Sequence, residues 1–350
     1  MLDTLTKHLS NGESLTTEQV SDAIRSLTNE TITPEAKADF LTALAIKGES
    51  TEEIAAFANE LLNKALPVPI DQETRDHEIL DVCGTGGDKL GTFNISTTVA
   101  IIAAAAGVTV AKHGNRAITS KAGSADVLDA LGIPTDLTPE QVATNLKDHQ
   151  FAFIFAPGYH PAFKNIMPAR KLCAERGQRT VFNFLGPLLN PARPTAQLIG
   201  VPDSKLCEPI GRVLQSIGIR RGMVVNGRVE DASMDELSTL GENTIAEFYQ
   251  GRGFTVSTDL PKLFPLQPVT LNELKGGDAE ENAATIKAIL SGEDRGPRRD
   301  AVLLNAAHAL FVATKTNSAL EGWDMAASVI ENGAAISNYR IWLATKFHYF

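Results

Sequence analysis

Residues 79–98 read ILDVCGTGGDKLGTFNISTT, which sets a short apolar run, a glycine-rich turn and a polar helix start one after another. The apolar run, Ile79 to Val82, is typical of a buried strand. Gly84, Gly86 and Gly87 follow and let the backbone turn with its N–H groups exposed. The segment therefore predicts a strand, a tight turn and a helix, the repeating unit of an α/β fold.

The turn and the helix after it predict a site for an anion. Ser96 and Thr97 add hydroxyl donors at a helix N-terminus, which itself favours negative charge. The segment has neither the Gly-Lys-Ser end of a Walker A loop nor the Gly-x-Gly-x-x-Gly spacing of a dinucleotide-binding turn. A plain glycine-rich turn would explain the glycines alone, but not the glycines together with Asn94, Ser96 and Thr97, so we favour a phosphate site.

A second polar segment follows the next predicted strand. Lys112, His113 and Asn115 come at the end of that strand, and the polar residues 119–126 precede another helix. Ligands collect at the carboxyl ends of parallel strands, so we expect both polar segments to face one pocket. Lys112 supplies a compact cation for a phosphate, and Ser124 is predicted to be a helix N-cap that holds a second anionic group. Asn115 offers a donor and an acceptor to a small polar substrate.

The whole chain predicts a small helical domain and a larger α/β domain. Its 350 residues, 43% of them hydrophobic, suffice for about two globular domains. Residues 1–70 contain two capping boxes and a proline at a helix start, so we expect an α-helical domain there and an α/β domain over residues 71–350. Parallel βαβ units are predicted from strands at Ile79 to Val82, Val108 to Ala111, Phe151 to Phe155, Leu198 to Val201 and Met223 to Val225.

The last third of the chain is less regular. Residues 248–253 and the segment containing Pro261, Pro265 and Pro268 are interpreted as excursions from the α/β repeat. Two or three final helices are expected from about Ala279 onward.

Charge and cysteine content argue against several classes of protein. The formal net charge is −10, which repels nucleic acid and anionic membranes, so any phosphate site must be local. The three cysteines lack the spacing of a zinc site or a disulfide framework, and we expect a reducing compartment. The N-terminus lacks the pattern of a signal peptide, and the longest apolar run is too short to span a bilayer. These features predict a cytoplasmic protein without a membrane partner.

Two further residues lie after the predicted strand that ends at Phe155. His160 follows this strand closely, and Arg170 lies in the next predicted helix. Each alone is most often a core histidine or a surface charge. Together they suggest a carboxylate site, because the planar guanidinium of Arg170 can bind a carboxylate through two parallel hydrogen bonds.

Asp235 and Glu236 form an adjacent acidic pair. Adjacent carboxylates repel, so such a pair is either solvated or held together by a hard cation. Beside a phosphate site we favour Mg²⁺, which commonly bridges carboxylates and substrate phosphates.

The sequence resembles the anthranilate phosphoribosyltransferase family over most of its length. Each motif alone is weak, but their ordered set is highly specific. The motifs are Gly84-Thr85-Gly86-Gly87-Asp88, Asn94-Ile95-Ser96-Thr97, Lys112-His113-Gly114-Asn115-Arg116, Gly123-Ser124-Ala125-Asp126, His160-Pro161-Ala162, Asn183-Phe184-Leu185-Gly186-Pro187-Leu188 with Asn190-Pro191-Ala192, and Met234-Asp235-Glu236-Leu237-Ser238.

The resemblance implies a fold of the nucleoside-phosphorylase and phosphoribosyltransferase type, with a helical segment near residues 161–180 joined to the helical domain. It implies a homodimer formed through the helical domains and a pocket between the two domains. Phosphoribosyl pyrophosphate would be held by Gly84, Gly87, Asp88, Thr92, Asn94, Ser96, Thr97, Lys112 and Ser124. Anthranilate would be held by Asn115 and Arg170, with His113 and His160 nearby, and two Mg²⁺ ions would be bound by Ser96, Asp235 and Glu236.

The reaction implied is attack of the anthranilate amine on ribose C1, with loss of pyrophosphate, as in tryptophan biosynthesis. We expect a dissociative path with a cationic C1 stabilised by the ring oxygen. No residue is then required as a strong base, and Lys112 and Arg170 assist through electrostatics and orientation.

Three alternatives remain open at the level of sequence. The stretch from Arg170 to Gly186-Pro187, which contains residues 171–178 and lies beside the expected acceptor pocket, is a few residues longer than is usual in the family. A relative that uses a different amine is therefore one alternative. A pyrimidine-nucleoside phosphorylase is the second, since it shares the fold but needs no acidic metal pair. The third is a non-catalytic relative that binds nucleic acid, which the charge of −10 argues against.

Overall fold

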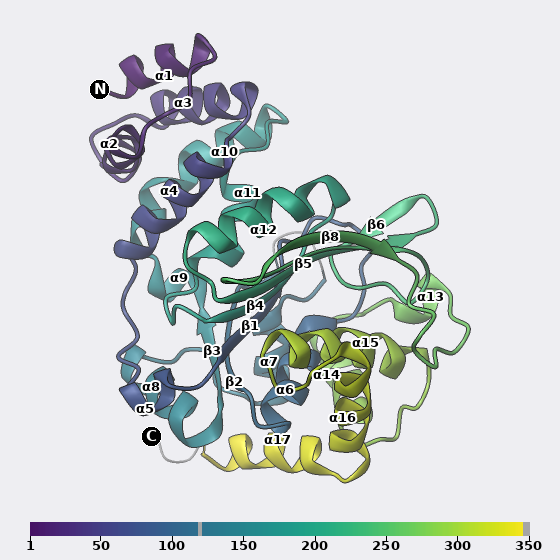
Figure 1. The fold of residues 1–350 in the computed structure, drawn as a ribbon. Coiled ribbons are helices and arrows are strands. Elements are labelled where there is room, and N and C mark those ends of the chain that lie inside the picture. The colour runs from purple at the N-terminus through teal and green to yellow at the C-terminus, as the bar shows by residue number, and fades with distance from the viewer. Residues whose placement is uncertain (118–120, 346–350) are drawn as a thin grey trace.

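A computed structural model describes residues 1–117 and 121–345 of the chain. In Figure 1 the N-terminal helices form a lobe at one end of the molecule, and the rest of the chain builds a twisted sheet with helices on both faces. This arrangement confirms the expected fold class, a helical N-terminal part and a larger α/β part. Among the described residues, no helix combines the length and the apolar character needed to cross a membrane.

The N-terminal helices begin at the signals that the sequence predicts. Thr16 accepts a hydrogen bond from the backbone N–H of Gln19, whose side chain accepts one from the N–H of Thr16, and Ser50 and Glu53 form the same capping box. Pro34 begins the third helix. The helices of this part are α1 (Leu2–Ser10), α2 (Thr17–Leu27), α3 (Pro34–Lys47) and α4 (Thr51–Asn63). The short α5 (Gln72–Arg75) follows in the chain and lies apart from them (Figure 1).

A later segment of the chain packs against these helices. Helix α10 (Met167–Glu175) lies against α3, and Ala38, Ala169 and Cys173 share one apolar core with the N-terminal helices. Lys37 Nζ donates a hydrogen bond to the carbonyl of Asn165 at 2.9 Å. The segment that connects α4 to α5 contains the boundary that the sequence predicts at residue 70.

Within the described residues, one mixed sheet runs in the order β3-β2-β1-β4-β5-β7-β8, with β6 paired to β5. The pairs among β3, β2, β1, β4 and β5 are parallel, and β5 pairs antiparallel with β6 and β7. The strands are β1 (Ile79–Gly84), β2 (Thr109–Gly114), β3 (Phe151–Phe155), β4 (Ala196–Gly200), β5 (Arg221–Val229), β6 (Ala232–Met234), β7 (Asn243–Tyr249) and β8 (Gly253–Asp259).

Alternate residues of the parallel strands enter different apolar cores. Leu80, Val82 and Leu198 pack into the core with α6 (Ile95–Ala105) and the C-terminal helices, whereas Cys83 and Ile199 pack into the core with the N-terminal helices. Both faces of these strands are therefore buried, which is why they read as continuous apolar runs.

The interpretation of the last third was wrong in two respects. Residues 248–253 belong to an antiparallel hairpin of β7 and β8, not to an excursion. From Ala279 onward the described chain forms four helices, where two or three were expected. They are α14 (Ala279–Leu290), α15 (Pro297–Val312), α16 (Ala319–Glu331) and α17 (Ala334–Thr345).

The remaining helices connect or flank the strands. They are α7 (Ser124–Leu131), α8 (Pro139–His149), α9 (Ala156–Tyr159), α11 (Phe182–Leu185), α12 (Cys207–Ser216) and α13 (Leu271–Leu274), with 3-10 helices η1 (Pro161–Asn165), η2 (Gly186–Leu189) and η3 (Ser204–Leu206).

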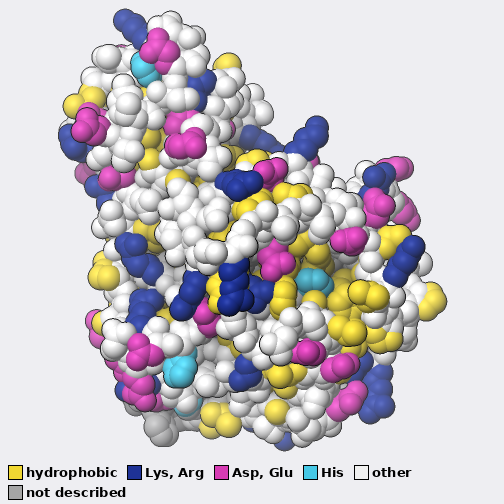
Figure 2. Space-filling model, in the orientation of Figure 1, with side chains coloured by type: hydrophobic (Ala, Val, Ile, Leu, Met, Phe, Trp, Pro, Cys, Tyr) yellow, Lys and Arg dark blue, Asp and Glu magenta, His cyan; other side chains and the backbone are white. Residues whose placement is uncertain are grey.

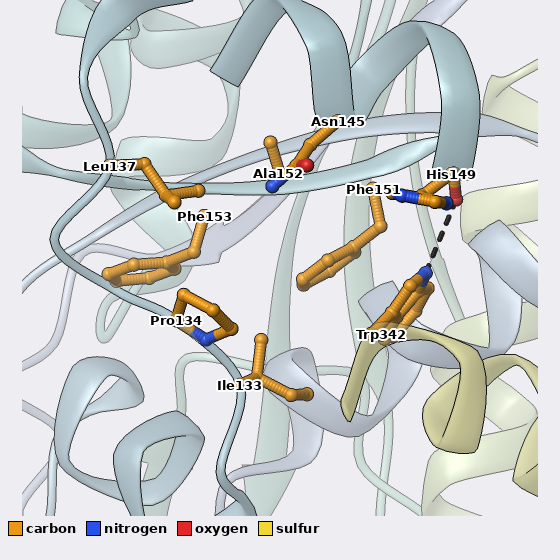
Figure 3. A pocket seen from close by; sticks show the side chains of 9 residues that line it. All are labelled: Ile133, Pro134, Leu137, Asn145, His149, Phe151, Ala152, Phe153 and Trp342. Carbon is orange, nitrogen blue, oxygen red and sulfur yellow. Dashed lines mark hydrogen bonds between the residues drawn. The ribbon is translucent and has the colours of Figure 1, made fainter. Parts of the chain in front are cut away.

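A small apolar pocket lies between α8, β3 and α17, at the amino end of β3 (Figure 3). The rings of Phe151 and Trp342 stack beside it at 4.4 Å, and Trp342 Nε1 donates to the carbonyl of His149 at 3.4 Å. Its cavity volume of about 20 Å³ holds roughly one water molecule. The pocket is therefore a packing feature, far too small for a phosphorylated sugar.

Candidate active site

The segment after β6 lies directly on the carboxyl ends of β1 and β4. A Cβ atom on Gly200, the last residue of β4, would overlap the backbone carbonyl of Asp235. A Cβ atom on Gly84, the last residue of β1, would overlap the Asp235 carboxylate. Both strands end in glycine because only a hydrogen at Cα leaves room for this approach. The contact brings Asp235 and Glu236 to the glycine-rich turn.

The glycine-rich turn is held by that acidic segment. Gly86, Gly87 and Gly91 have φ angles of 75°, 95° and 66°, which favour glycine. The N–H of Gly86 donates to Asp235 Oδ2 at 2.7 Å. The backbone N–H of Asp235 in turn donates to Asp88 Oδ2 at 3.4 Å. The turn and the acidic pair, 149 residues apart at Gly86 and Asp235, thus form one structure.

The acidic pair carries excess negative charge. Glu236 Oε1 accepts the backbone N–H of Ser96 at 3.1 Å. Burial raises the pKa of Glu236 to about 7, although the charge of Lys112 opposes the shift. Burial and the negative charges of Asp88 and Glu236 hold the pKa of Asp235 well above its ordinary range. Carboxylates in this arrangement are stabilised by a hard cation, so the donor set fits Mg²⁺.

In the part of the chain that the structure describes, no three His, Cys, Asp or Glu side chains are placed to hold a metal ion by themselves. Mg²⁺ usually takes one or two carboxylates and completes its shell with water and substrate phosphates. The donors present therefore fit a metal that arrives with a phosphorylated ligand.

Lys112 lies beneath this cluster and is almost fully buried in β2, with 1% of its surface exposed. Its Nζ donates to the carbonyl of Val82 at 2.6 Å and to Ser96 Oγ at 3.3 Å. Burial lowers the pKa of Lys112. The side chain is thus fixed beside the first turn of α6.

Three other predicted ligands of the phosphorylated sugar surround the start of α6. Asn94 is its N-cap residue, and Thr92 pairs with Lys275 in an isolated bridge. Thr97 is fully buried in the first turn, and its hydroxyl has no hydrogen-bond partner among the described residues. Asn115 follows β2, and its Oδ1 accepts the N–H of Arg116 at 2.7 Å.

Ser124 is not the helix N-cap that the sequence suggests. Gly123 is the N-cap of α7, and Ser124 is the first helical residue. A Cβ at position 123 would overlap the backbone of Ala117, so the close approach of the two backbones requires glycine there. Asp126 closes the cap by accepting the N–H of Gly123 at 2.9 Å. Thr119 and Ser120, in the polar segment before this helix, lie outside the described residues.

His113 and His160 form a buried pair with ring centroids 5.4 Å apart. Burial lowers the pKa of His113 to about 3 and that of His160 to about 4. The rings hydrogen-bond with the backbone of Gly186 and Leu189, respectively, while neither Nε2 has a partner among the described residues. The pair is therefore neutral at pH 7 and keeps two unused polar atoms.

Arg170 lies on α10, at the far end of a row of rings. The ring of His160 contacts Phe163 at 5.6 Å, Phe163 contacts Phe182 at 5.5 Å, and the guanidinium of Arg170 lies over Phe182 at 5.5 Å. Burial lowers the pKa of Arg170. The structure thus connects Arg170 to the histidine pair through two phenylalanines.

Sequence reasoning missed Asp81, a fully buried carboxylate in β1. It accepts the backbone N–H of His113 at 3.2 Å and the side-chain amides of Asn190 at 2.9 Å and Gln197 at 3.4 Å. Burial raises its pKa to about 6. The sequence contains a signal for this residue, because a charged side chain inside an apolar strand needs buried hydrogen-bond partners.

On the face shown in Figure 2, Lys and Arg side chains gather near the middle of the molecule, although the net charge is −10. This distribution agrees with a local site for an anion on an acidic protein.

Two family models match this chain. The model of the glycosyl transferase family a/b domain matches residues 76–336, and that of the helical bundle domain of the same family matches residues 3–65. The chain is therefore a glycosyl transferase of this two-part type. Anthranilate phosphoribosyltransferase of Petrotoga mobilis is 45% identical over 325 residues, 93% of this chain and 91% of the relative. The chain belongs to the anthranilate phosphoribosyltransferase family.

Solved structures agree with this assignment. The Thermus thermophilus anthranilate phosphoribosyltransferase has a TM-score of 0.87 and 40% identity, covering 97% of this chain and 98% of that one. The Saccharomyces cerevisiae enzyme, solved in complex with PRPP and Mg, has a TM-score of 0.86 and 27% identity, covering 98% and 97%. The same yeast enzyme in complex with 4-fluoroanthranilate has a TM-score of 0.83 and 26% identity, covering 99% and 98%.

The buried His160 predicts a loss of stability in acid. An unfolded histidine has a pKa near 6.5, so between pH 6.5 and about 4 the unfolded chain binds a proton that folded His160 does not. Stability therefore falls as the pH falls through this window. The free energy of unfolding, measured by urea denaturation, should fall between pH 7 and pH 5 in both wild type and His160→Gln. We expect this fall to be smaller in His160→Gln by about 2 kcal/mol.

The variant His77→Gln, which removes an exposed imidazole, serves as the control. The prediction would be contradicted if the free energy of unfolding fell by the same amount between pH 7 and pH 5 in wild type and in His160→Gln.

Proposed function

We propose that this protein transfers the phosphoribosyl group of phosphoribosyl pyrophosphate to the amine of anthranilate, with release of pyrophosphate, in tryptophan biosynthesis. The observation that carries the proposal is that two hydrogen bonds, Gly86–Asp235 and Ser96–Glu236, hold the acidic pair against the glycine turn and the start of α6. A site for a phosphate and a site for a hard cation are thereby adjacent. The names of the relatives and the ligands in the yeast structures support the same reaction.

In this proposal the phosphorylated sugar lies over the start of α6. Lys112 uses two of its three N–H groups on Val82 and Ser96, which leaves a third for a phosphate oxygen. Because its position is already set, little reorganisation accompanies the growth of negative charge on the departing pyrophosphate. The residues proposed to hold this substrate are Gly84, Gly87, Asp88, Thr92, Asn94, Ser96, Thr97, Lys112 and Ser124.

Ser96, Asp235 and Glu236 are proposed to hold two Mg²⁺ ions. When bound, Mg²⁺ neutralises charge on the pyrophosphate. Asp235 also keeps the glycine turn in place through Gly86, so the same carboxylate shapes the phosphate site and contributes to the cation site.

Arg170 is proposed to bind the anthranilate carboxylate, and Asn115, His113 and His160 to line the acceptor pocket. The two neutral imidazoles suit an aromatic amine, because they add no charge that would compete with Arg170. Their role is orientation and the exclusion of water, since attack on a cationic C1 needs no strong base.

We further propose a homodimer formed through the helical part, residues 1–70 with the segment near 161–180. Ile46 on α3 is 76% exposed, and Met167 on α10, which packs against α3, is 49% exposed. Exposed apolar side chains on two helices that pack together are typical of an interaction surface.

We also propose that the protein works in the reducing cytoplasm, because its three cysteines are free and buried.

The reaction is tested with purified protein, phosphoribosyl pyrophosphate, Mg²⁺ and anthranilate. We expect anthranilate fluorescence to fall in step with the release of pyrophosphate. Substituted anthranilates and other aromatic amines should react more slowly. Faster reaction with another amine would indicate a different acceptor, and phosphate-dependent release of free base from thymidine or uridine would indicate a nucleoside phosphorylase.

Removal of the acidic pair tests the cation site. The double variant Asp235→Asn, Glu236→Gln keeps the size of both side chains and should lower turnover by at least about 100-fold, because pyrophosphate leaves without its counter-charge. The dependence of the remaining rate on Mg²⁺ should also be lost, while the melting temperature changes little. The matched control is Glu230→Gln, Asp231→Asn, which changes two consecutive acidic residues that are exposed in the turn between β5 and β6. An unchanged Mg²⁺ response in the first variant would exclude the assignment.

The dimer is tested by sedimentation equilibrium. Ile46→Glu should weaken self-association at least about tenfold, because a charge would be buried at the interface. Leu263→Glu, at a side chain 82% exposed in the α/β part, should leave association unchanged. A monomeric wild type at micromolar concentration would rule out the dimer.

A further inference from the structure

Asn282, on helix α14, contacts the start of α6 from a distant part of the chain. It is 188 residues from Asn94 in sequence, and 3% of its surface is exposed. Its Nδ2 donates to Asn94 Oδ1 at 3.0 Å, and its Oδ1 accepts the backbone N–H of Gly277 at 2.8 Å. This contact connects a helix that the proposed reaction does not use to a residue proposed to bind the phosphorylated sugar.

The backbone determines which way both amides point. The N–H of Gly277 can only donate, so the atom of Asn282 that faces it must be the oxygen. The nitrogen of Asn282 therefore faces Asn94, and the atom of Asn94 that meets it must be the acceptor Oδ1. Asn94 Nδ2 is left on the other side, where it donates to the carbonyl of Ala122 at 3.4 Å.

Asn94 is thereby held as a hydrogen-bond donor toward the candidate active site. It is the N-cap residue of α6 and partly exposed, next to the helix start that holds Ser96. An amide nitrogen carries two hydrogens, and the contact with Ala122 uses one of them. The other can donate to a phosphate or hydroxyl oxygen. If the amide turned over, an oxygen would face the anion instead and repel it.

The segment just before α14, which leads to Asn282, is fixed against residues 91–93 independently of this contact. The N–H of Phe93 donates to the carbonyl of Leu274 at 3.0 Å. The N–H of Gly276 donates to the carbonyl of Gly91 at 2.8 Å. A Cβ at Gly276 would lie 2.8 Å from Phe93 Cα, so the two backbones lie in direct contact. Loss of the Asn282 side chain should therefore leave the position of the 91–94 segment largely unchanged.

We propose that Asn282 is a positioning residue, which orients the Asn94 amide so that its N–H groups face the phosphoribosyl substrate. This inference rests on the proposed function. It predicts that Asn282 affects the binding of phosphoribosyl pyrophosphate through Asn94 and has no direct contact with either substrate.

The variant Asn282→Asp tests the orientation. An ionised carboxylate accepts the N–H of Gly277 but cannot donate to Asn94 Oδ1, so the Asn94 amide turns and presents its oxygen to the site. We expect KM for phosphoribosyl pyrophosphate to rise about tenfold, with KM for anthranilate changed less than about twofold. Asn272→Asp is the matched control, because it adds the same charge at an exposed asparagine of α13.

A double-mutant cycle separates orientation from other effects. In the Asn94→Ala background, Asn282→Asp should cause no further rise in KM for phosphoribosyl pyrophosphate, because the residue through which it acts is absent. An equal rise in both backgrounds would overturn the inference and assign the effect to charge or to the Gly277 contact. If Asn282→Asp does not fold, as judged by circular dichroism, the same cycle with Asn282→Ala decides the question.

The wild-type assay distinguishes the two failures. A wild type that does not consume phosphoribosyl pyrophosphate with anthranilate would refute the proposed function. An active wild type whose KM for phosphoribosyl pyrophosphate is unaffected by Asn282→Asp would refute only the role of Asn282.

Discussion

The backbone of Asp235 lies against the last residues of β1 and β4, and the candidate site depends on that contact. Side chains at Gly84 or Gly200 would push the acidic segment away from the strand ends. With glycine at both positions, the Asp235 carboxylate reaches the N–H of Gly86 and closes the glycine-rich turn. Steric freedom at two strand ends therefore determines where the carboxylates lie, and the carboxylates determine the shape of the turn.

Around this contact the protein buries opposite charges on neighbouring strands. Asp81 and Lys112 lie inside the sheet, and each is held by hydrogen bonds. Glu236 is a third charged group of this cluster and accepts the N–H of Ser96. Burial of these groups costs free energy, which the hydrogen bonds offset in part. Burial, and after it the negative charge of Asp88, raises the pKa values of Asp235 and Glu236, so Lys112 does not fully compensate the charge of these carboxylates. A site with this deficit suits a ligand that brings a divalent cation with it.

The side of the site that is proposed to bind the acceptor contains mainly neutral and aromatic groups. His113 and His160 are enclosed and uncharged, and phenylalanines separate them from Arg170. A single cation beside neutral and aromatic groups favours a planar ligand with one carboxylate. In the proposed function the two sides of the site thus suit substrates of different charge, and Asn282 of helix α14 contacts Asn94 on the side proposed for the sugar.

Much of the local structure follows from short-range patterns. The capping boxes at Thr16 and Ser50, the strand from Phe151 to Phe155 and the glycine turn are encoded by residues within a few positions of each other. The same holds for the identity of many candidate ligands, since their motifs are continuous in sequence. The family and the fold class could therefore be predicted before any coordinates were considered.

Contacts between distant residues could not be predicted in this way. The glycines at 251 and 253 indicate a turn, but whether that turn ends an excursion or a hairpin depends on the pairing of β7 with β5 and with β8. The N-cap at Gly123 depends on the backbone of Ala117, which the sequence does not place. Asn282 resembles any helical asparagine until the fold brings it 3.0 Å from Asn94. Hydrogen bonds and steric contacts between remote segments exist only in the folded chain, and they decide how the ligands predicted from motifs are oriented.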